Sequence, residues 1–129
     1  MKEADLYKIL VKKAINTMFV RIENKLNLGT PDIYFVNKNC CGWLEAKKLT
    51  LGEKYEGIVK IPFRPYQFEW LEKNYKHGGM SVLGIISDWG IYFAINEAIK
   101  LEYNRSDFRN GKLICPNNYD LFFSILNTI

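Results

Sequence analysis

The sequence contains no uninterrupted apolar run of the roughly 18 residues that a membrane-spanning helix needs. Its best candidate, residues 81–95, is broken by Ser87, Asp88 and Gly90. The first residues read MKEADLYKILVKKA, which is a charged segment without the apolar centre of a secretory signal. We therefore expect a protein that has no membrane partner and that is made and kept in the cytoplasm.

Cysteine, histidine and proline are also scarce. The three cysteines, Cys40, Cys41 and Cys115, are odd in number and include an adjacent pair, which excludes a disulfide framework. His77 is the only histidine and has no metal-ligand spacing to them, which argues against a zinc site. Four prolines and an aromatic content of 15% exclude disorder for most of the chain. We expect reduced thiols that pack as small hydrophobic side chains.

The composition is that of one folded domain with an uneven charge. Its 129 residues, 48% hydrophobic and 25% charged, predict a single domain over residues 1–129. The net charge is +4, but residues 1–64 carry twelve Lys and Arg against seven Asp and Glu, whereas residues 65–129 carry six against seven. A positive half suits a polyanionic partner such as nucleic acid, although a solvated surface of uneven charge gives the same totals.

Hydrophobic periodicity predicts a mixed α/β (α+β) architecture, with a central sheet flanked by helices. A long loop is predicted over 48–60, and residues 103–116 are expected to be irregular apart from one short strand at 112–115. Asn96 is expected to cap the short helix that follows it, and Pro65 suits the first turn of its helix. Helices are predicted over 2–16, 64–77, 97–102 and 119–127, and strands over 18–22, 32–37, 42–47, 80–87 and 90–95.

Two carboxylates and a lysine fall on the first predicted hairpin. Asp32 opens one strand, and Glu45 and Lys47 share one face of the next, because alternate strand residues point the same way. If Asn37 lies opposite Gly42, Asp32 lies opposite Lys47 and diagonal to Glu45, about 7 Å away or less. A register shifted by one residue would put the two carboxylates on opposite faces. The prediction of one acidic patch therefore depends on a register of this parity or on a bulge.

Such a patch has a chemical use. Two carboxylates at this spacing can hold a hard cation such as Mg²⁺, which activates a water for attack on a phosphate. A neighbouring lysine can orient or deprotonate that water or stabilise the charge that develops on phosphorus. An ordinary hairpin with an exposed, salt-bridged face is the alternative, since an Asp…Glu-x-Lys pattern is common.

The surrounding residues resemble the PD-(D/E)xK nuclease superfamily. The resemblance is carried by Gly29-Thr30-Pro31-Asp32, Trp43-Leu44-Glu45-Ala46-Lys47-Lys48, Gln67 and Gly78-Gly79, in that order. Within the superfamily the chain is similar to RecU-type Holliday-junction resolvases and VRR-NUC nucleases, many of them phage-encoded. The likeness covers about residues 2–95 and implies a restriction-endonuclease-like fold. The tail after Asn96 matches no part of these families.

The resemblance also implies roles for single residues. Asp32, Glu45, Lys47 and Gln67 would be catalytic, and Glu3, Asp32, Glu45 and the Ala46 carbonyl would bind the metal. Asp5 and Glu23 compete with Glu3 for the third acidic position. The implied cofactor is Mg²⁺, with Mn²⁺ as a substitute and no small-molecule cofactor. Backbone phosphates would be bound by Lys12, Lys13, Lys48, Lys54, Lys60 and Arg64.

The implied function is a divalent-metal-dependent endonuclease that hydrolyses phosphodiester bonds in branched DNA during recombination or repair. A homodimer is expected, because two-fold symmetry matches paired incisions on a four-way junction. One alternative is a nuclease of the same fold that acts on flaps, nicks or duplex DNA. Another is a non-catalytic DNA-binding module, against which the intact Asp32, Glu45 and Lys47 argue. A purely structural interaction protein would leave the acidic patch and the basic half unexplained.

Overall fold

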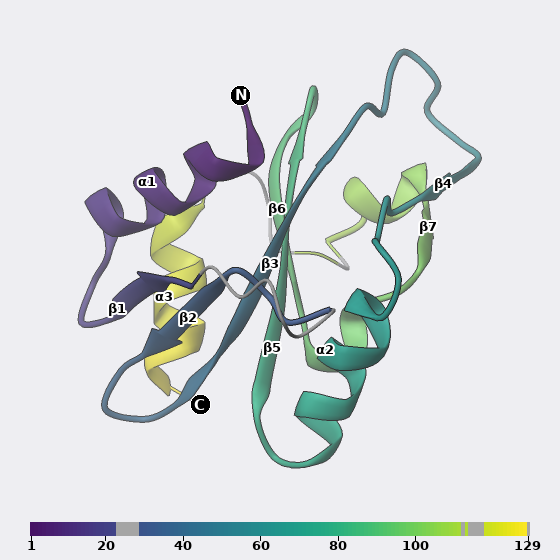
Figure 1. Cartoon of the computed structure of the whole chain (residues 1–129). Helices are drawn as coiled ribbons and strands as arrows, with labels where there is room; N and C mark the ends of the chain where they lie inside the picture. Colours follow the sequence, from purple (N-terminus) through teal and green to yellow (C-terminus); the bar gives the residue numbers. More distant parts are fainter. Residues whose placement is uncertain (23–28, 112, 114–117, 129) are drawn as a thin grey trace.

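Five strands form one mixed sheet in the computed structural model, which describes residues 1–22, 29–111, 113 and 118–128 (Figure 1). The sheet order is β1-β2-β3-β5-β6, in which β3 and β5 run parallel and the other neighbours antiparallel. β3 and β5 are central, and their apolar residues are buried on both faces of the sheet. The strands are β1 (Met18–Arg21), β2 (Ile33–Val36), β3 (Cys41–Leu49), β5 (Met80–Ser87) and β6 (Gly90–Ile95).

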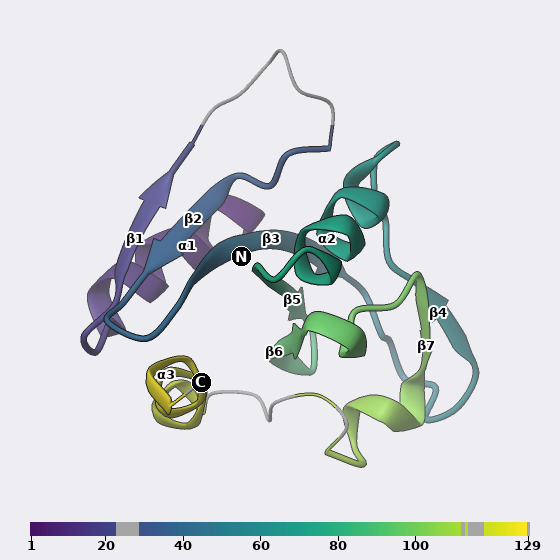
Figure 2. The same cartoon turned by 90° about the horizontal axis from the view of Figure 1, so that it is seen from below.

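Helices α1 (Glu3–Lys13) and α3 (Tyr119–Thr128) cover one face of the sheet (Figure 2). Leu6 and Leu10 lie one turn apart on α1 and are fully buried against the sheet. On α3, the ring of Phe122 stacks on Phe93 of β6, with ring centroids 4.0 Å apart. The two ends of the chain therefore meet over one apolar core.

The other face is covered by α2 (Gln67–Lys76) and by a small second sheet of β4 (Ile58–Lys60) and β7 (Glu102–Asn104). Two 3₁₀ turns, η1 (Asn96–Ala98) and η2 (Arg105–Phe108), complete this layer. Leu71 of α2 is fully buried there. None of the helices in the described residues is long and apolar enough to cross a membrane.

The structure confirms the mixed sheet flanked by helices and corrects several local predictions. The predicted loop 48–60 contains the last residues of β3 and all of β4, which pairs with β7 far along the chain, at Val59 and Tyr103. Such a distant pairing leaves no local periodicity. The predicted helix 97–102 is only the turn η1, and Asn96 accepts a hydrogen bond from the Ser81 backbone instead of capping a helix.

Two helices are shorter than predicted. α1 ends at Lys13, since Ala14 has an extended ψ of 132°. α2 begins at Gln67, because Tyr66 has a left-handed φ of 73° that no helix interior accepts. Pro65 therefore lies outside the helix. The predicted strand at 112–115 lies outside the described residues except for Leu113, and of the two described thiols Cys41 is exposed.

The hairpin of β2 and β3 has a register two residues away from the predicted one. Phe35, not Asn37, lies opposite Gly42, and Ile33 lies opposite Leu44. Asn37 instead holds the turn, because its side chain accepts hydrogen bonds from the backbone of Asn39 and Cys40. A Cβ atom on Gly42 would lie 2.8 Å from the ring of Phe35, so glycine gives that ring its space. The shift is even, and the faces of both strands are therefore as predicted.

Candidate functional site

The observed register brings Asp32 and Glu45 into line. Continuing the pairing of Ile33 with Leu44 by one residue sets Asp32 directly opposite Glu45 rather than opposite Lys47. Trp43, Glu45 and Lys47 face α2, whereas Leu44 and Ala46 enter the core beneath α1 and α3. The hairpin thus presents its acidic residues on the α2 side of the sheet.

Glu45 is the centre of this site. Its side chain lies at the middle of β3 and only 2% of the residue is exposed. Oε1 accepts a hydrogen bond of 3.0 Å from Nε2 of Gln67 and lies 3.6 Å from Nζ of Lys47. Oε2 is buried and has no hydrogen bond of good geometry among the described residues, although the Asp32 backbone lies close enough to the carboxylate to lower its pKa. A buried carboxylate oxygen without a donor is costly, so this atom calls for a functional explanation.

Burial raises the pKa of Glu45 to about 7, because the charged form loses its hydration. The negative charge of Asp32 raises the pKa further, and Lys47 lowers it. Glu3 adds a smaller repulsion, which means that its carboxylate lies within electrostatic range of Glu45. A carboxyl group with a pKa near neutrality in such a place is typical of functional sites.

Gln67 is held by the start of α2. Its Oε1 accepts a 2.7 Å hydrogen bond from the Arg64 backbone, which leaves Nε2 directed at Glu45. Tyr66, in its left-handed conformation, sets the direction in which the helix leaves. The segment before Asp32 packs here too: a Cβ atom on Gly29 would lie 2.5 Å from the Tyr66 carbonyl oxygen. Glycine at position 29 therefore allows β2 and α2 to meet beside Glu45.

The first turn of α1 reaches the same edge of the sheet. Oε2 of Glu3 accepts a hydrogen bond of 3.1 Å from the Lys48 backbone. Asp5 is engaged elsewhere, since its carboxylate accepts from the Lys2 backbone at 2.7 Å and closes the helix start. Glu23 lies outside the described residues. Of the two acidic candidates that the structure describes, Glu3 is therefore the one directed toward β3.

The carboxylates are grouped loosely. Among the described residues, no three His, Cys, Asp or Glu side chains approach closely enough to enclose a metal ion. The donor chemistry nevertheless suits a hard cation: all the acidic side chains offer oxygen, and one of them has a buried, unpartnered atom. The methyl group of Ala46 is buried on the opposite face of β3.

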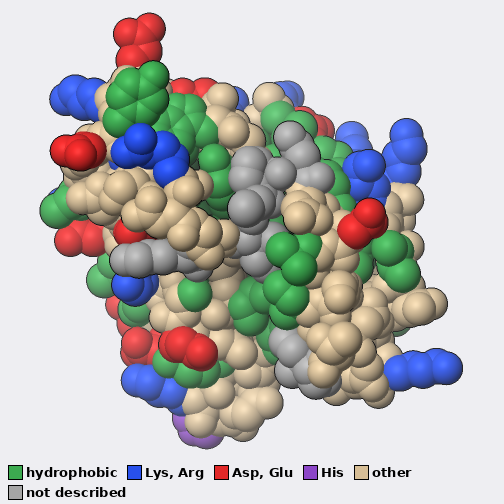
Figure 3. All heavy atoms as spheres, turned by 180° about the vertical axis from the view of Figure 1, so that it is seen from behind, with side chains coloured by type: hydrophobic (Ala, Val, Ile, Leu, Met, Phe, Trp, Pro, Cys, Tyr) green, Lys and Arg blue, Asp and Glu red, His purple; other side chains and the backbone are tan. Residues whose placement is uncertain are grey.

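The predicted phosphate-binding residues are spread over the molecule. Lys48 is exposed near the end of β3, and Lys54, Lys60 and Arg64 are exposed on the segment that follows. Lys60 lies opposite Glu102 on the small sheet. Seen from behind, basic and acidic side chains are interspersed rather than gathered into one basic stripe (Figure 3). On this face, the described residues therefore form no continuous basic path for a DNA backbone.

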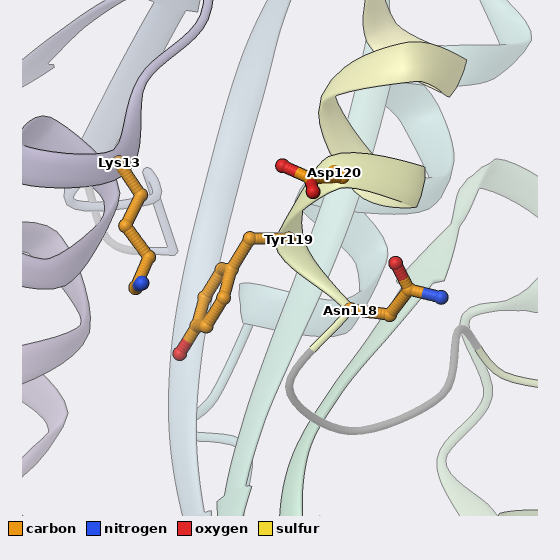
Figure 4. Close-up of a pocket in the computed structure, with 4 residues that line it drawn as sticks. All are labelled: Lys13, Asn118, Tyr119 and Asp120. Carbon is orange, nitrogen blue, oxygen red and sulfur yellow. The ribbon is translucent and has the colours of Figure 1, made fainter.

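Lys12 and Lys13 lie at the end of α1 away from Glu3. An 11-residue helix separates its ends by about 15 Å, so these lysines are remote from Glu45. Nζ of Lys13 lies 5.1 Å from the ring centre of Tyr119 on α3. Figure 4 shows both side chains at a small cavity of about 210 Å³, which Asn118 and Asp120 also line. Lys13 thus joins α1 to α3.

The loop that carries Lys54 is fixed by the C-terminal half of the chain. Arg105 donates to the Leu51 carbonyl, and Arg109 donates to the Tyr55 carbonyl. Trp89, on the turn between β5 and β6, donates to the Gly52 carbonyl at 2.8 Å. The loop is therefore anchored at three points along its length.

Sequence reasoning gave no role to three residues around the site. No sequence pattern marks Tyr66 as a residue with left-handed backbone. Oγ1 of Thr30 is buried without a hydrogen-bond partner among the described residues, and its burial follows from tertiary packing, which the sequence does not display. Trp70 contacts Trp43, with ring centroids 5.5 Å apart. Helical spacing gave a usable signal for Trp70, because it follows Gln67 by three residues and so shares its face.

No protein-family model matches the sequence, and no curated protein matches it either. Among solved structures, the chain is similar to Hjc of Archaeoglobus fulgidus, a Holliday junction resolvase from an archaeal hyperthermophile. The TM-score is 0.53 at 16% sequence identity, over 79% of this chain and 83% of that one. At this identity the likeness concerns the fold. The chain has a restriction-endonuclease-like fold, with a mixed sheet flanked by helices.

Proposed function

We propose that the chain is a divalent-metal-dependent endonuclease that hydrolyses phosphodiester bonds in branched DNA. One observation carries this proposal: buried Glu45 is held by Gln67 and Lys47, is aligned with Asp32, and keeps one oxygen without a partner among the described residues. A purely structural carboxylate would have this oxygen paired. The similarity of the fold to a Holliday junction resolvase supports the choice of reaction.

Glu45 and Asp32, with Glu3 at the edge, would hold the cation. Oxygen ligands of this kind prefer Mg²⁺, and Mn²⁺ accepts the same donors. When bound, the ion supplies Lewis-acid polarisation of the phosphate and a more acidic water. The pKa of Glu45 is raised toward 7, which means that near neutral pH a cation competes with a proton for its carboxylate.

The chain's own residues would orient the metal-binding carboxylate and stabilise charge on the phosphate. Gln67 fixes the orientation of Glu45 through its hydrogen bond to Oε1. Lys47 is a compact cation, 4% exposed, that can stabilise the negative charge gained by the phosphate oxygens. In the reaction a water molecule loses a proton as its oxygen bonds to phosphorus, the bond from phosphorus to the leaving oxygen breaks, and that oxygen gains a proton.

Branched DNA is proposed as the substrate because of symmetry. A homodimer would present two Glu45 sites related by a two-fold axis, and a four-way junction offers two strands of like polarity with the same symmetry. We expect cleavage of a junction to exceed that of linear duplex of equal length by at least about tenfold, or about 1.4 kcal/mol of differential binding. Two symmetric nicks near the branch point are expected.

The test uses end-labelled four-way junction, flap, single-stranded and linear duplex DNA, each with Mg²⁺, Mn²⁺ or EDTA. We expect metal-dependent nicks in the junction, mapped on every strand. Glu45→Gln should remove them, and Glu97→Gln, which changes an exposed acid on η1, should not. Absence of cleavage in every substrate and metal would overturn the proposal.

The alternatives predict other outcomes of this assay. A nuclease for flaps, nicks or duplex would cut those substrates as well as the junction or better, or would nick one strand only. A non-catalytic module would bind DNA in both wild type and Glu45→Gln and would give no metal-dependent product.

A further inference from the structure

The face of the sheet that carries Asp32 and Glu45 continues into an apolar surface that is partly exposed among the described residues. Residues that pair across β1, β2 and β3 form two rows on this face. Met18 is 58% exposed and Val20 is 37% exposed, although both belong to a strand. We call this surface the open face; its rows are Met18–Val36–Cys41 and Val20–Tyr34–Trp43.

Aromatic rings connect the open face to α2. The rings of Tyr34 and Trp43 meet edge to face, with centroids 5.3 Å apart. Trp43 in turn meets Trp70 of α2 at 5.5 Å and 72°. All three residues are only partly buried, so part of the ring surface remains accessible. Edge-to-face packing holds such rings rigid, and a rigid aromatic platform loses little entropy when a ligand stacks on it.

A cavity opens beside Trp70. It has a volume of about 420 Å³ and is lined by Trp70, Lys73, Asn74 and His77. This volume lies within the range of sites that bind small organic groups. The amide of Asn74 is engaged with the Met80 carbonyl and with Ser81, so it fixes the wall.

One cationic side chain, Lys73, lines the cavity. Lys73 makes no ion pair within the described residues, and His77 lies one turn further on the same side of α2. The acidic residue Glu72 is turned away and pairs with Lys76 at 3.5 Å. An aromatic wall with a lysine beside it complements a nucleic-acid strand, which offers flat bases and negative phosphates.

The position of the platform relates it to the proposed site. The row of Tyr34 and Trp43 lies next to the row of Asp32 and Glu45 on the same face. Alternate residues of a strand are about 7 Å apart, which is on the scale of one nucleotide. A strand with its phosphate at Glu45 would therefore bring a neighbouring base to Trp43 and Trp70.

We propose that Trp43, Trp70 and the cavity beside them form a binding site for an unpaired nucleobase that flanks the phosphate at Glu45, with Lys73 and His77 contacting the backbone. This inference rests on the proposed function, because it names the substrate feature that the same site prefers. Bases in intact duplex are stacked on one another and cannot occupy the site, whereas bases at a branch point are free to do so.

The test is a binding measurement that needs no cleavage. A short single-stranded oligonucleotide containing 2-aminopurine is titrated with protein in EDTA, and its fluorescence is followed. Stacking on Trp70 should quench the probe, and Trp70→Leu should weaken binding about tenfold, within the range known for single base–aromatic stacks. The control is Leu121→Ala, at an exposed residue of α3 on the opposite face of the sheet, which should change affinity less than twofold. Equal effects of the two variants would overturn the proposal.

A second variant guards against misfolding of Trp70→Leu. Lys73 is exposed, so Lys73→Glu should leave the thermal unfolding curve unchanged and still weaken oligonucleotide binding, with a shallower dependence on salt. An unchanged affinity and salt slope would overturn the proposal. If no DNA is cleaved but these binding effects appear, the nuclease proposal fails and the base site stands. If DNA is cleaved and neither variant alters binding, the base site alone fails.

The rival occupant of the open face is a second copy of this chain. Met18→Lys is placed at its exposed rim, and sedimentation reports the oligomeric state. Dissociation of a dimer by this variant, with oligonucleotide binding unaffected by Trp70→Leu, would assign the face to contact between copies and overturn the nucleobase site. If Met18→Lys leaves the oligomeric state unchanged and Trp70→Leu weakens oligonucleotide binding, the nucleobase site is supported.

Discussion

The two faces of β3 are buried to the same degree, but one carries apolar side chains and the other carries charged ones. Leu44 and Ala46, on the side of α1 and α3, are 0% and 8% exposed, and Glu45 and Lys47, on the side of α2, are 2% and 4% exposed. One short segment thus supplies an apolar core on one face and an ion pair on the other. Burial alone therefore does not separate the residues that stabilise the fold from those proposed to act on DNA.

The energetic consequences of the two faces are opposite. Burying a leucine such as Leu44 contributes about 1.5–3 kcal/mol to folding. A buried ion pair contributes little net stability, because desolvation offsets the attraction between the charges. In Glu45 one oxygen also lacks a donor among the described residues, which adds to the cost. The α2 side of β3 is therefore best explained by function, and the following experiments test that difference.

The largest expected effect is on cleavage. Glu45→Gln keeps the shape of the side chain and removes the charge that would hold the cation. Junction cleavage should fall below detection in single-turnover assays, while DNA affinity stays the same or rises because a negative charge near phosphate is lost. Wild-type cleavage in this variant would refute the assignment of the acidic side to catalysis.

On the opposite face, Leu44→Ala should act on stability alone. Removing this fully buried side chain should lower the free energy of unfolding by about 2–5 kcal/mol in a denaturant titration. Leu101→Ala, at a residue that is 54% exposed, is the control and should stay within about 0.5 kcal/mol. At temperatures where it is folded, Leu44→Ala should cleave like the wild type. If folded Leu44→Ala lost cleavage activity, the separation of β3 into a stabilising face and a catalytic face would be wrong.

The pH dependence of stability distinguishes the faces further. The pKa of Glu45 rises from 4.5 to about 7 on folding, so the folded state binds this proton more tightly than the unfolded state. Protonation of Glu45 therefore adds to the free energy of unfolding. This contribution, on the order of 3 kcal/mol, is fully present below pH 4.5 and is lost as pH rises through about 7. Chemical denaturation in EDTA should show this loss in wild type, and the loss should be missing in Glu45→Gln. Parallel pH profiles of the two proteins would contradict the raised pKa.

The smallest of these effects is expected for Lys47. Lys47→Ala removes the cation beside Glu45 and should slow single-turnover cleavage about 10²-fold, the usual scale for a lost charge-stabilising or proton-transferring group. Lys100→Ala, at an exposed lysine, serves as the control. If both variants cleave at the wild-type rate, Lys47 is a structural partner of Glu45 and no more.

Periodicity predicted most of the elements that have a local cause. The strands 80–87 and 90–95 were predicted with the bounds they have, because both are continuous apolar runs bounded by a turn. The pairing of β4 with β7 could not be predicted, since three-residue strands carry no pattern of their own. The start of α2 was missed because it depends on the backbone of Tyr66, where Gly29 comes into contact.

The sequence by itself determined that Glu45 and Lys47 share one face of β3, because alternation along a strand is a local property. Placing Asp32 on that face required an assumed register, and the observed register differs from it by two residues, which leaves the faces unchanged. Only the tertiary structure decided the alignment of Asp32 with Glu45, the burial of Glu45 and the contact with Gln67. The register depends on the turn at Asn37, which has local hydrogen bonds and a distant one, from the Asn37 side chain to the Leu126 carbonyl. The contact with Gln67 depends on how α2 packs on β3, two segments that are apart in the chain.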